Sequence, residues 1–190
     1  MLNKIKRLLQ KIGCFSSVED LSKSQELSFR EASIDDLDFI HTEIVEEAKN
    51  GHFSSFFYTQ PEANKGLKSN LESIITRQRR LDENAVTYAY IAEYKGNLAS
   101  FIILTKQHFN DKESTEIWMA ATKQQYRNKG IAQNFINIIL TELKSTKLDT
   151  AIVYSRCLKN SENMYKLLIK KGFSHEKTDE NGTRLLVYTL

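Results

Sequence analysis

Along the first half of the chain, the spacing of hydrophobic residues predicts one strand followed by two helices. Residues 26–31 alternate between polar and apolar positions, as a strand with one buried face does. From Ser33 onward, apolar residues recur every three or four positions, which predicts a helix that ends at Asn50-Gly51. A second helix is expected from Pro61, with Leu67, Leu71, Ile74 and Leu81 on its apolar face and Lys68, Arg77, Arg79 and Arg80 on its polar face.

From residue 85 the apolar residues alternate, so the pattern predicts three consecutive strands joined by tight turns. The first covers 86–93 and the second 98–105, with Lys95-Gly96-Asn97 as the turn between them. A turn at 110–112 leads into the third strand, which carries Glu116 near its start. A helix follows this strand, because its apolar residues share one face: Ile131, Phe135, Ile138, Ile139 and Leu143.

The last part of the chain predicts a short strand, a helix and a closing hairpin. Residues 149–154 have the β-branched, apolar composition of a strand that is buried on both faces. A helix is expected over 161–171, ended by Gly172, and the segments 173–177 and 183–189 form the hairpin. The predicted order is β-α-α-β-β-β-α-β-α-β-β, which places the chain among the α/β (α+β) proteins.

The first 25 residues form a separate segment in this reading. Leu2, Ile5, Leu9 and Ile12 share one helical face, and the remaining positions of residues 1–13 carry four basic residues and no acid. Two interpretations of this basic amphipathic helix stay open: it packs on its own domain or a second subunit, or it makes a peripheral contact with a membrane surface. Residues 15–25 are polar and Ser-rich, so the expected division is 1–25, helix plus linker, and 26–190, one domain.

Composition narrows the class of protein. The 190 residues carry a formal net charge of +3, and the basic residues are spread along the chain, which argues against a nucleic-acid partner. Two cysteines, Cys14 and Cys157, provide neither a disulfide framework nor metal-ligand spacing, so no metal is expected and the cytoplasm is the expected compartment. No run approaches the roughly 20 apolar residues of a membrane span.

The loop between the third strand and the following helix has the chemistry of an anion site. A helix N-terminus leaves backbone N–H groups unpaired and carries the positive end of the helix dipole, which suits a phosphate or pyrophosphate. Gly130 lets the backbone approach an anion closely, and Ala132 keeps the first turn free of a large side chain. The loop lacks the two glycines and Gly-Lys-Ser/Thr end of a Walker loop and the Gly-x-Gly-x-x-Gly pattern of a Rossmann fold.

The segment Arg127-x-x-Gly130-x-Ala132, placed between strand and helix, resembles the Arg/Gln-x-x-Gly-x-Gly/Ala signature of the GNAT superfamily of N-acetyltransferases. The resemblance covers residues 26–190 in order of elements, and it implies a mixed, mostly antiparallel central sheet flanked by helices. It also implies that the loop binds the pyrophosphate of acetyl-coenzyme A and that strand backbone runs beside the pantetheine arm. The residues concerned are Arg127, Asn128, Lys129, Gly130, Ile131 and Ala132 for the pyrophosphate, and Ala120, Ala121 and Thr122 for the arm.

The resemblance also suggests catalytic groups. Glu116 stands where many family members place an acid that removes the proton of the amine through water; the alternative is a strand-end glutamate that faces solvent. The segment 160–173 is similar to the family's Asn-x-x-Ala-x-x-Leu-Tyr-x-x-x-Gly-Phe motif, which implies that Asn160 contacts coenzyme A. In register with Gly172-Phe173, however, the tyrosine position holds Leu168 and the asparagine position holds Ser161. Two interpretations stay open: Tyr165, one helical turn earlier, is the acid for the leaving thiolate, or it is a half-buried helix residue and the protein has no tyrosine acid. Tyr154 is another hydroxyl that could reach the sulfur.

An acceptor site and three functions follow from this resemblance. His52 and Phe53, in an aromatic loop between the first two helices, are expected to wall the acceptor pocket. The leading expectation is transfer of an acetyl group from acetyl-coenzyme A to a primary amine of a small molecule or peptide. The alternatives are an acyltransferase with a longer acyl donor and a non-catalytic module that binds coenzyme A or a partner.

Overall fold

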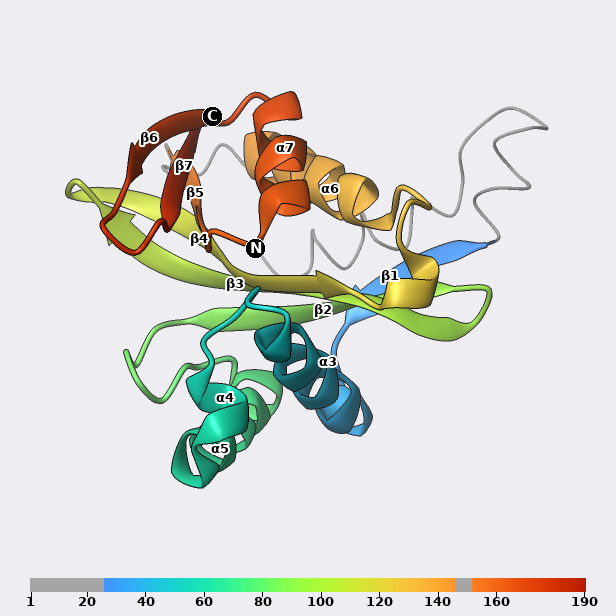
Figure 1. The fold of residues 1–190 in the computed structure, drawn as a ribbon. Coiled ribbons are helices and arrows are strands. Elements are labelled where there is room, and N and C mark those ends of the chain that lie inside the picture. The colour runs from blue at the N-terminus through green and yellow to red at the C-terminus, as the bar shows by residue number, and fades with distance from the viewer. Residues whose placement is uncertain (1–25, 146–151) are drawn as a thin grey trace.

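The computed structural model describes residues 26–145 and 152–190 and shows a seven-stranded sheet with helices on both faces (Figure 1). The strands are β1 (Leu27–Glu31), β2 (Thr87–Tyr94), β3 (Asn97–Phe109), β4 (Lys112–Thr122), β5 (Ile152–Cys157), β6 (Ser174–Thr178) and β7 (Arg184–Thr189). The helices are α3 (Leu37–Lys49), α4 (Phe56–Thr59), α5 (Pro61–Arg77), α6 (Ile131–Ser145) and α7 (Glu162–Lys170), with 3-10 turns at Ile34–Asp36 and Gln124–Tyr126. The predicted N-terminal helix and linker, residues 1–25, lie outside the described residues.

The sheet confirms the predicted mixed, mostly antiparallel arrangement. Its strand order is β1-β2-β3-β4-β5-β7-β6, and every neighbouring pair is antiparallel except β4 and β5. The parallel pair is separated in sequence by α6, as a parallel connection requires. The two predicted hairpin turns are present, and each has two consecutive residues with positive φ, Lys95-Gly96 and Asn110-Asp111. Such turns match the twist of the strands they join.

Two hydrophobic cores lie on opposite faces of the sheet. The helices α6 and α7 cover one face, and α3, α4 and α5 lie on the other (Figure 1). Phe135, Leu140 and Leu168 belong to the first core, and Ile44 and Leu71 to the second. Leu140 was not among the predicted core residues of α6, whereas the predicted residue Ile138 is only half-buried. Because the sheet is covered on both faces, its central strands are apolar at nearly every position.

The two parallel strands separate toward their C-terminal ends. The register pairs Ser114 with Ile152 and continues to Ile117 and Ser155, where it stops. Beyond this point β4 stays paired with β3, with a register shift between Ile103 and Leu104 on β3 that gives β4 an extra residue, Trp118. A bulge increases local twist and re-aims the strand. The separation opens the sheet beside the loop that leads into α6.

The segment after α5 differs from the sequence prediction. The helix ends at Arg77 because Gln78 adopts a left-handed conformation, with φ of 55°. Leu81 therefore does not extend the apolar stripe and is 57% exposed. Arg80, predicted on a polar helix face, lies beyond the helix and is 3% exposed. The spacing of apolar residues predicted a longer helix, because it gives no sign of the left-handed residue at which the helix ends.

Candidate functional site

The loop after β4 is held to the rest of the molecule by Arg127. The Nε atom of Arg127 donates a hydrogen bond to the carbonyl oxygen of Thr122 at 3.0 Å, and its Nη2 lies 2.6 Å from Oε1 of Glu47 on α3. The first contact closes the loop onto the strand before it, and the second joins it to a helix on the opposite face of the sheet. The guanidinium group therefore positions the loop through contacts within the protein.

Beyond Arg127 the loop presents backbone groups. Asn128 and Gly130 have positive φ angles of 63° and 75°, and α6 begins at Ile131. Within the described ranges, no hydrogen bond reaches the backbone N–H groups of residues 128–133, as expected where a helix begins. A Cβ atom built on Gly130 would meet only the side chain of Asn134, at 3.9 Å, so the space in front of the glycine is open. These amides form a cradle for an anion.

The strand that leads into the cradle has one edge without a neighbouring strand. β4 pairs with β3 as far as Thr122, whereas its pairing with β5 stops at Ile117. In the part of the chain that the structure describes, no strand therefore lies against residues 118–122 on the β5 side. Ala120, Ala121 and Thr122 lie on this stretch, immediately before the loop. Their backbone can pair with an extended group that enters between the two strands.

Glu116 lies in the middle of β4, because the strand begins at Lys112. It is 1% exposed, and its Oε1 accepts hydrogen bonds from Nη2 and Nε of Arg156 at 2.6 and 2.9 Å. Its Oε2 lies 3.9 Å from Nη1 of Arg80. Among the described residues, neither Oε2 of Glu116 nor Nη1 of Arg80 has a hydrogen-bond partner. One oxygen of Glu116 is thus held by Arg156, and the other is free to accept a further donor.

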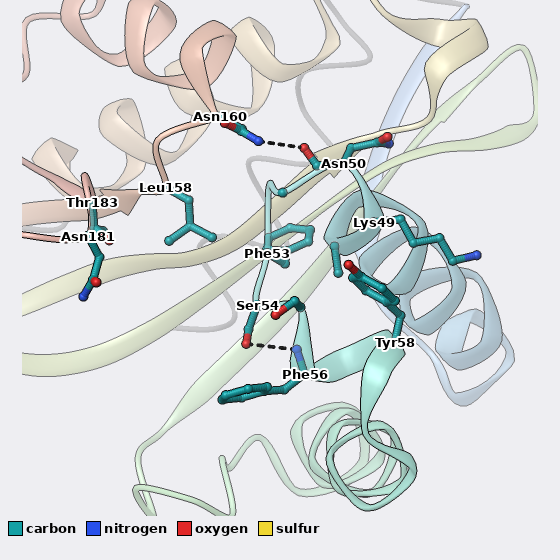
Figure 2. A pocket seen from close by; sticks show the side chains of 13 residues that line it. Lys49, Asn50, Phe53, Ser54, Phe56, Tyr58, Leu158, Asn160, Asn181 and Thr183 are labelled. Atoms are coloured by element: carbon teal, nitrogen blue, oxygen red, sulfur yellow. Dashed lines mark hydrogen bonds between the residues drawn. The ribbon is translucent and has the colours of Figure 1, made fainter.

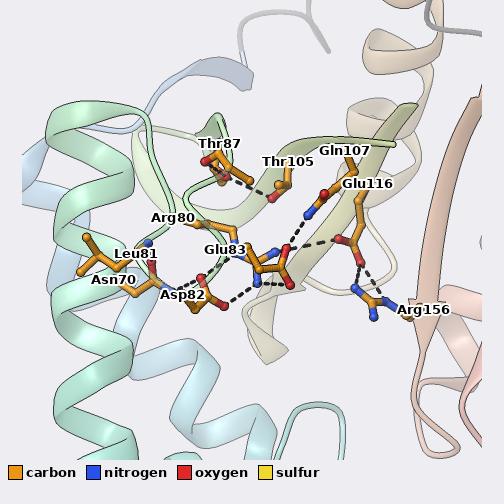
Figure 3. Close-up of polar contacts among 11 residues, drawn as sticks. Asn70, Arg80, Leu81, Asp82, Glu83, Thr87, Thr105, Gln107, Glu116 and Arg156 are labelled. Carbon is orange, nitrogen blue, oxygen red and sulfur yellow. Dashed lines mark hydrogen bonds and ion pairs between the residues drawn. The ribbon is translucent and has the colours of Figure 1, made fainter. Parts of the chain in front are cut away.

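Arg80 connects Glu116 to an acidic turn after α5 (Figure 3). Its Nη2 lies 2.6 Å from Asp82 and 3.3 Å from Glu83, and its guanidinium carbon lies 3.9 Å from the centre of the Trp118 ring. A buried cation needs such partners to offset its desolvation. The cluster that surrounds the predicted catalytic carboxylate therefore combines β4, β5 and a turn more than 30 residues earlier.

The hydroxyl group of Tyr165 faces the outer part of the sheet. It lies 3.2 Å from Nδ1 of His175 on β6, and the guanidinium group of Arg184 on β7 lies over the tyrosine ring. Leu168 occupies the family's tyrosine position and is fully buried in the core under α7. A hydroxyl at that position is therefore absent, and Tyr165 is engaged with the closing hairpin.

Tyr154 is paired directly with Glu116 across the parallel strands. Burial, with a contribution from the negative charge of Glu116, raises the pKa of Tyr154 to about 12. The tyrosine ring also packs against Phe109, with ring centres 5.1 Å apart. The raised pKa keeps the Tyr154 hydroxyl protonated throughout the neutral range.

A pocket of about 770 Å³ lies between the loop after α3, the loop after β5 and the loop between β6 and β7 (Figure 2). It is lined by Ala48, Lys49, Asn50, Gly51, Phe53, Ser54, Ser55, Phe56, Tyr58, Leu158, Asn160, Asn181 and Thr183. Phe53, predicted as a wall of the acceptor pocket, is part of this lining. His52, predicted beside it, is not, because its ring is directed to α7.

Two side-chain contacts hold the loop after α3 against the start of α7. The Asn160 Nδ2 donates a hydrogen bond to the carbonyl oxygen of Asn50 at 3.2 Å, and the Ser161 hydroxyl lies 3.4 Å from Nδ1 of His52. The other ring nitrogen of His52 lies 3.8 Å from Glu47, which also binds Arg127. The pocket loop and the anion cradle are therefore connected through α3.

Several residues of this site were not singled out from the sequence: Glu47, Asn50, Arg80, Arg156, Asn181 and Thr183. Arg156 carried no clear signal either, because it lies beyond the strand predicted over 149–154 and its side chain is 54% exposed. The others lie on helix or loop surfaces by pattern. Their roles arise from contacts with segments far away in the chain.

The described residues include one cysteine, Cys157, which is buried. Burial raises the pKa of the Cys157 thiol to about 11, so the thiolate needed of a nucleophile is scarce at neutral pH. No group of three or more His, Cys, Asp and Glu side chains within 26–145 and 152–190 is arranged to hold a metal ion. None of the helices in these ranges is both long and apolar enough to span a membrane.

Comparison with known proteins adds independent findings. The acetyltransferase (GNAT) family matches the chain over residues 43–173, well over half of its length. Comparison with curated proteins gives no match.

Several solved structures have the same fold as this chain. PaiA N-acetyltransferase from Thermoplasma acidophilum with coenzyme A is 18% identical, with a TM-score of 0.62 over 86% of this chain and 99% of that one. Spermidine N-acetyltransferase from Vibrio cholerae with coenzyme A and spermine is 18% identical, with a TM-score of 0.62 over 86% and 95%. RimL, a ribosomal-protein alpha-N-acetyltransferase with coenzyme A, is 12% identical, with a TM-score of 0.63 over 87% and 94%.

Proposed function

The chain belongs to the acetyltransferase (GNAT) family, and from this premise we propose that it transfers the acetyl group of acetyl-coenzyme A to a primary amine of a small molecule or peptide. The observation that carries the proposal is the continuity of the unpaired β4 edge with the amide cradle at the start of α6. Together they provide backbone partners for an extended arm and then for a pyrophosphate. The similar structures that contain coenzyme A support this assignment.

The residues of the cradle fit the pyrophosphate in shape and charge. The open space at Gly130 admits a phosphate close to the backbone, and the N–H groups of residues 128–133 are available as donors. Lys129 and the rest of the exposed loop keep the surroundings positive or neutral. Arg127 acts indirectly, because its contacts with Thr122 and Glu47 hold the loop in place. Asn160 donates from its Nδ2 to Asn50, and its amide oxygen, which has no partner among the described residues, is available to coenzyme A.

The reaction requires a neutral amine. An alkyl amine has a pKa of about 10.4, so roughly one molecule in a few thousand is neutral at pH 7. The amine nitrogen attacks the thioester carbonyl carbon, the C–S bond breaks, and the proton lost by the amine must leave. We assign to Oε2 of Glu116, the oxygen not held by Arg156, the role of accepting this proton through water. A backbone N–H group of β4 polarises the carbonyl of the thioester.

The leaving thiolate requires less help. A thiol of this kind has a pKa of about 8.5, so the thiolate is a fair leaving group near neutral pH. Tyr165 is the proposed proton donor, and for this role its hydroxyl must exchange the contact with His175 for one with the sulfur. Tyr154 is the alternative donor because it is paired with Glu116 across the parallel strands, although its raised pKa makes it a weaker acid than an ordinary tyrosine.

Two measurements test the proposal in sequence. Calorimetry with acetyl-coenzyme A tests binding, and thiol release in the presence of a panel of amines tests transfer. We expect saturable binding and amine-dependent thiol release, with the acetylated amine detected by mass spectrometry. Binding without transfer to any amine would identify a non-catalytic module for coenzyme A. Absence of binding would remove the assignment of the cradle.

A further inference from the structure

The pocket beside the separated strands is built from three loops that are distant in sequence. Phe53, Ser54 and Phe56 form one wall, and Leu158 with the β6–β7 loop residues Asn181 and Thr183 faces them (Figure 2). Phe56 is 56% exposed, so its ring is available for contact with a molecule that enters the pocket. If the proposed function is correct, this pocket holds the part of the acceptor molecule that bears the amine.

The lining has almost no charge. Lys49 is its single charged residue, and the Lys49 ammonium is paired with Glu46 at 2.7 Å. Two carboxylates belong to the β6–β7 loop, and neither lines the pocket: Asp179 accepts hydrogen bonds from the backbone N–H groups of Asn181 and Thr183 at 2.9 and 2.8 Å, and Glu180 is exposed. The lining therefore offers no carboxylate to a second or third ammonium group of an acceptor.

The lining does offer neutral hydrogen-bonding groups. The side chains of Asn181 and Thr183 on one wall and the hydroxyls of Ser55 and Tyr58 on the other have no hydrogen-bond partner within the described part of the chain. Amides and hydroxyls of this kind pair with the C=O and N–H groups of a peptide-like molecule. Phe53 and Leu158 supply apolar contact between them.

We infer that the acceptor is a primary amine on an uncharged, peptide-like body, and not a polyamine. This inference rests on the proposed function. A polyamine would bring several ammonium groups into a pocket whose lining has no anion to replace their hydration. A neutral amide body would instead exchange water for Asn181, Thr183 and the opposite hydroxyls, and would cover the exposed ring of Phe56.

The test compares acceptors that differ in charge. The probes are spermidine, an amidated tetrapeptide with a free α-amino group, and an Nα-acetylated, amidated tetrapeptide with one lysine. The lysine peptide and spermidine both present an alkyl amine of similar basicity. A difference in kcat/KM between them therefore comes from the rest of the acceptor molecule. At saturating acetyl-coenzyme A, we expect kcat/KM for the better peptide to exceed that for spermidine by about tenfold or more.

A charge variant makes the test specific to this pocket. Asn181→Asp adds one carboxylate to the lining and is expected to raise kcat/KM for spermidine by about fivefold, the effect of one unit charge about 4 Å away in a solvated site. Asn110→Asp makes the same chemical change in the exposed β3–β4 turn, outside the lining, and should leave the preference unchanged.

The outcomes distinguish failure of the acceptor assignment from failure of the proposed acetyltransferase activity. Spermidine at or above both peptides, or an equal response to Asn181→Asp and Asn110→Asp, would overturn the acceptor assignment while acetyl transfer itself stands. No acetylation of any probe by protein that binds acetyl-coenzyme A would overturn the proposed function, and this inference with it.

Discussion

The proposed cofactor side and the proposed acceptor side of this protein are built in different ways. The cofactor side is a continuous segment, from the end of β4 through the loop into α6, and the groups we assign to binding are the backbone amides of residues 128–133. The acceptor side takes side chains from three loops centred on residues 50–58, 158–160 and 181–183. Glu47 on α3 connects the two sides through its contacts with Arg127 and His52.

This contrast between backbone groups and side chains offers a reason why one fold can use the same acetyl donor with different amine acceptors. Backbone groups at a helix start depend on little more than a glycine and a short loop, so the donor site tolerates wide sequence change. Side chains from separate loops can change one at a time, so the acceptor site can vary without disturbing the donor site. Substitutions in one region should therefore affect one substrate and spare the other.

The largest effect is expected for Glu116→Gln, on the strand that leads into the cradle. Loss of a general base typically lowers kcat by about 10²–10⁴-fold. Because the amine becomes neutral at high pH, the variant should recover part of its rate there, so its pH profile should move upward. Glu113→Gln, an exposed change three residues earlier on β4, is the control. If Glu116→Gln keeps its full kcat and an unchanged pH profile, Glu116 is not the base, and catalysis depends on how the two substrates are positioned.

Gly130→Val should weaken the donor side selectively. The residue has φ of +75°, and a β-branched side chain would both strain the backbone and fill the anion cradle. We expect affinity for coenzyme A, measured by calorimetry, to fall by tenfold or more, a factor that corresponds to about 1.4 kcal/mol.

The matched control for this change is Gly96→Val, in the β2–β3 turn. Gly96 has nearly the same φ, +73°, and equally open space around it. Both variants should lose similar stability in thermal unfolding, and only Gly130→Val should lose affinity. Equal affinity in the two variants would remove the pyrophosphate assignment.

Gly51→Ala should weaken the acceptor side. A Cβ atom on Gly51 would lie 2.3 Å from Nδ2 of Asn160, and the residue has φ of +76°, so the Asn160–Asn50 contact must break. We expect KM for the amine to rise several-fold, since loss of one positioning contact costs about 1 kcal/mol. Gly66→Ala on α5, where an added Cβ meets nothing within 4 Å, is the control. An unchanged KM would show that the three loops do not need this contact to form the pocket.

Tyr165→Phe should have a smaller effect on kcat and none on affinity for acetyl-coenzyme A. As the proposed donor to a thiolate that leaves readily, the hydroxyl should contribute about tenfold or less to kcat. Leu158→Ala, a change in the pocket lining that removes no hydroxyl, is expected to alter KM for the amine instead. Unchanged kcat across the pH range would assign the Tyr165 hydroxyl to its contact with His175 alone.

The smallest effect is expected for deletion of residues 1–21. They precede β1, and every residue assigned to the cradle or to the pocket comes after that strand in the chain. The truncated protein should keep its kcat/KM for both substrates. If it folds, by circular dichroism, and yet loses activity, the N-terminal segment contributes to the site or to an essential dimer.

Local signals were sufficient for the fold and for the cofactor side. The alternation of strands, the helical stripes and the turns at Lys95-Gly96 and Asn110-Asp111 are properties of neighbouring residues, and the described structure confirms their order. The loop at 127–132 was predictable for the same reason, because a strand, a glycine and a helix start are adjacent in the chain. Its role in binding coenzyme A remains a prediction.

The acceptor side was decided by the tertiary structure. Nothing in the sequence near residue 50 indicates that Asn50 will meet Asn160, or that Asn181 and Thr183 will face Phe53. Arg80 looked like a surface residue, and only the left-handed turn at Gln78 brings it into the interior beside Glu116. Contacts between distant segments depend on how the sheet pairs and twists, which no local pattern encodes. The sequence alone determined the backbone-built part of the site, and the tertiary structure decided the part built from side chains.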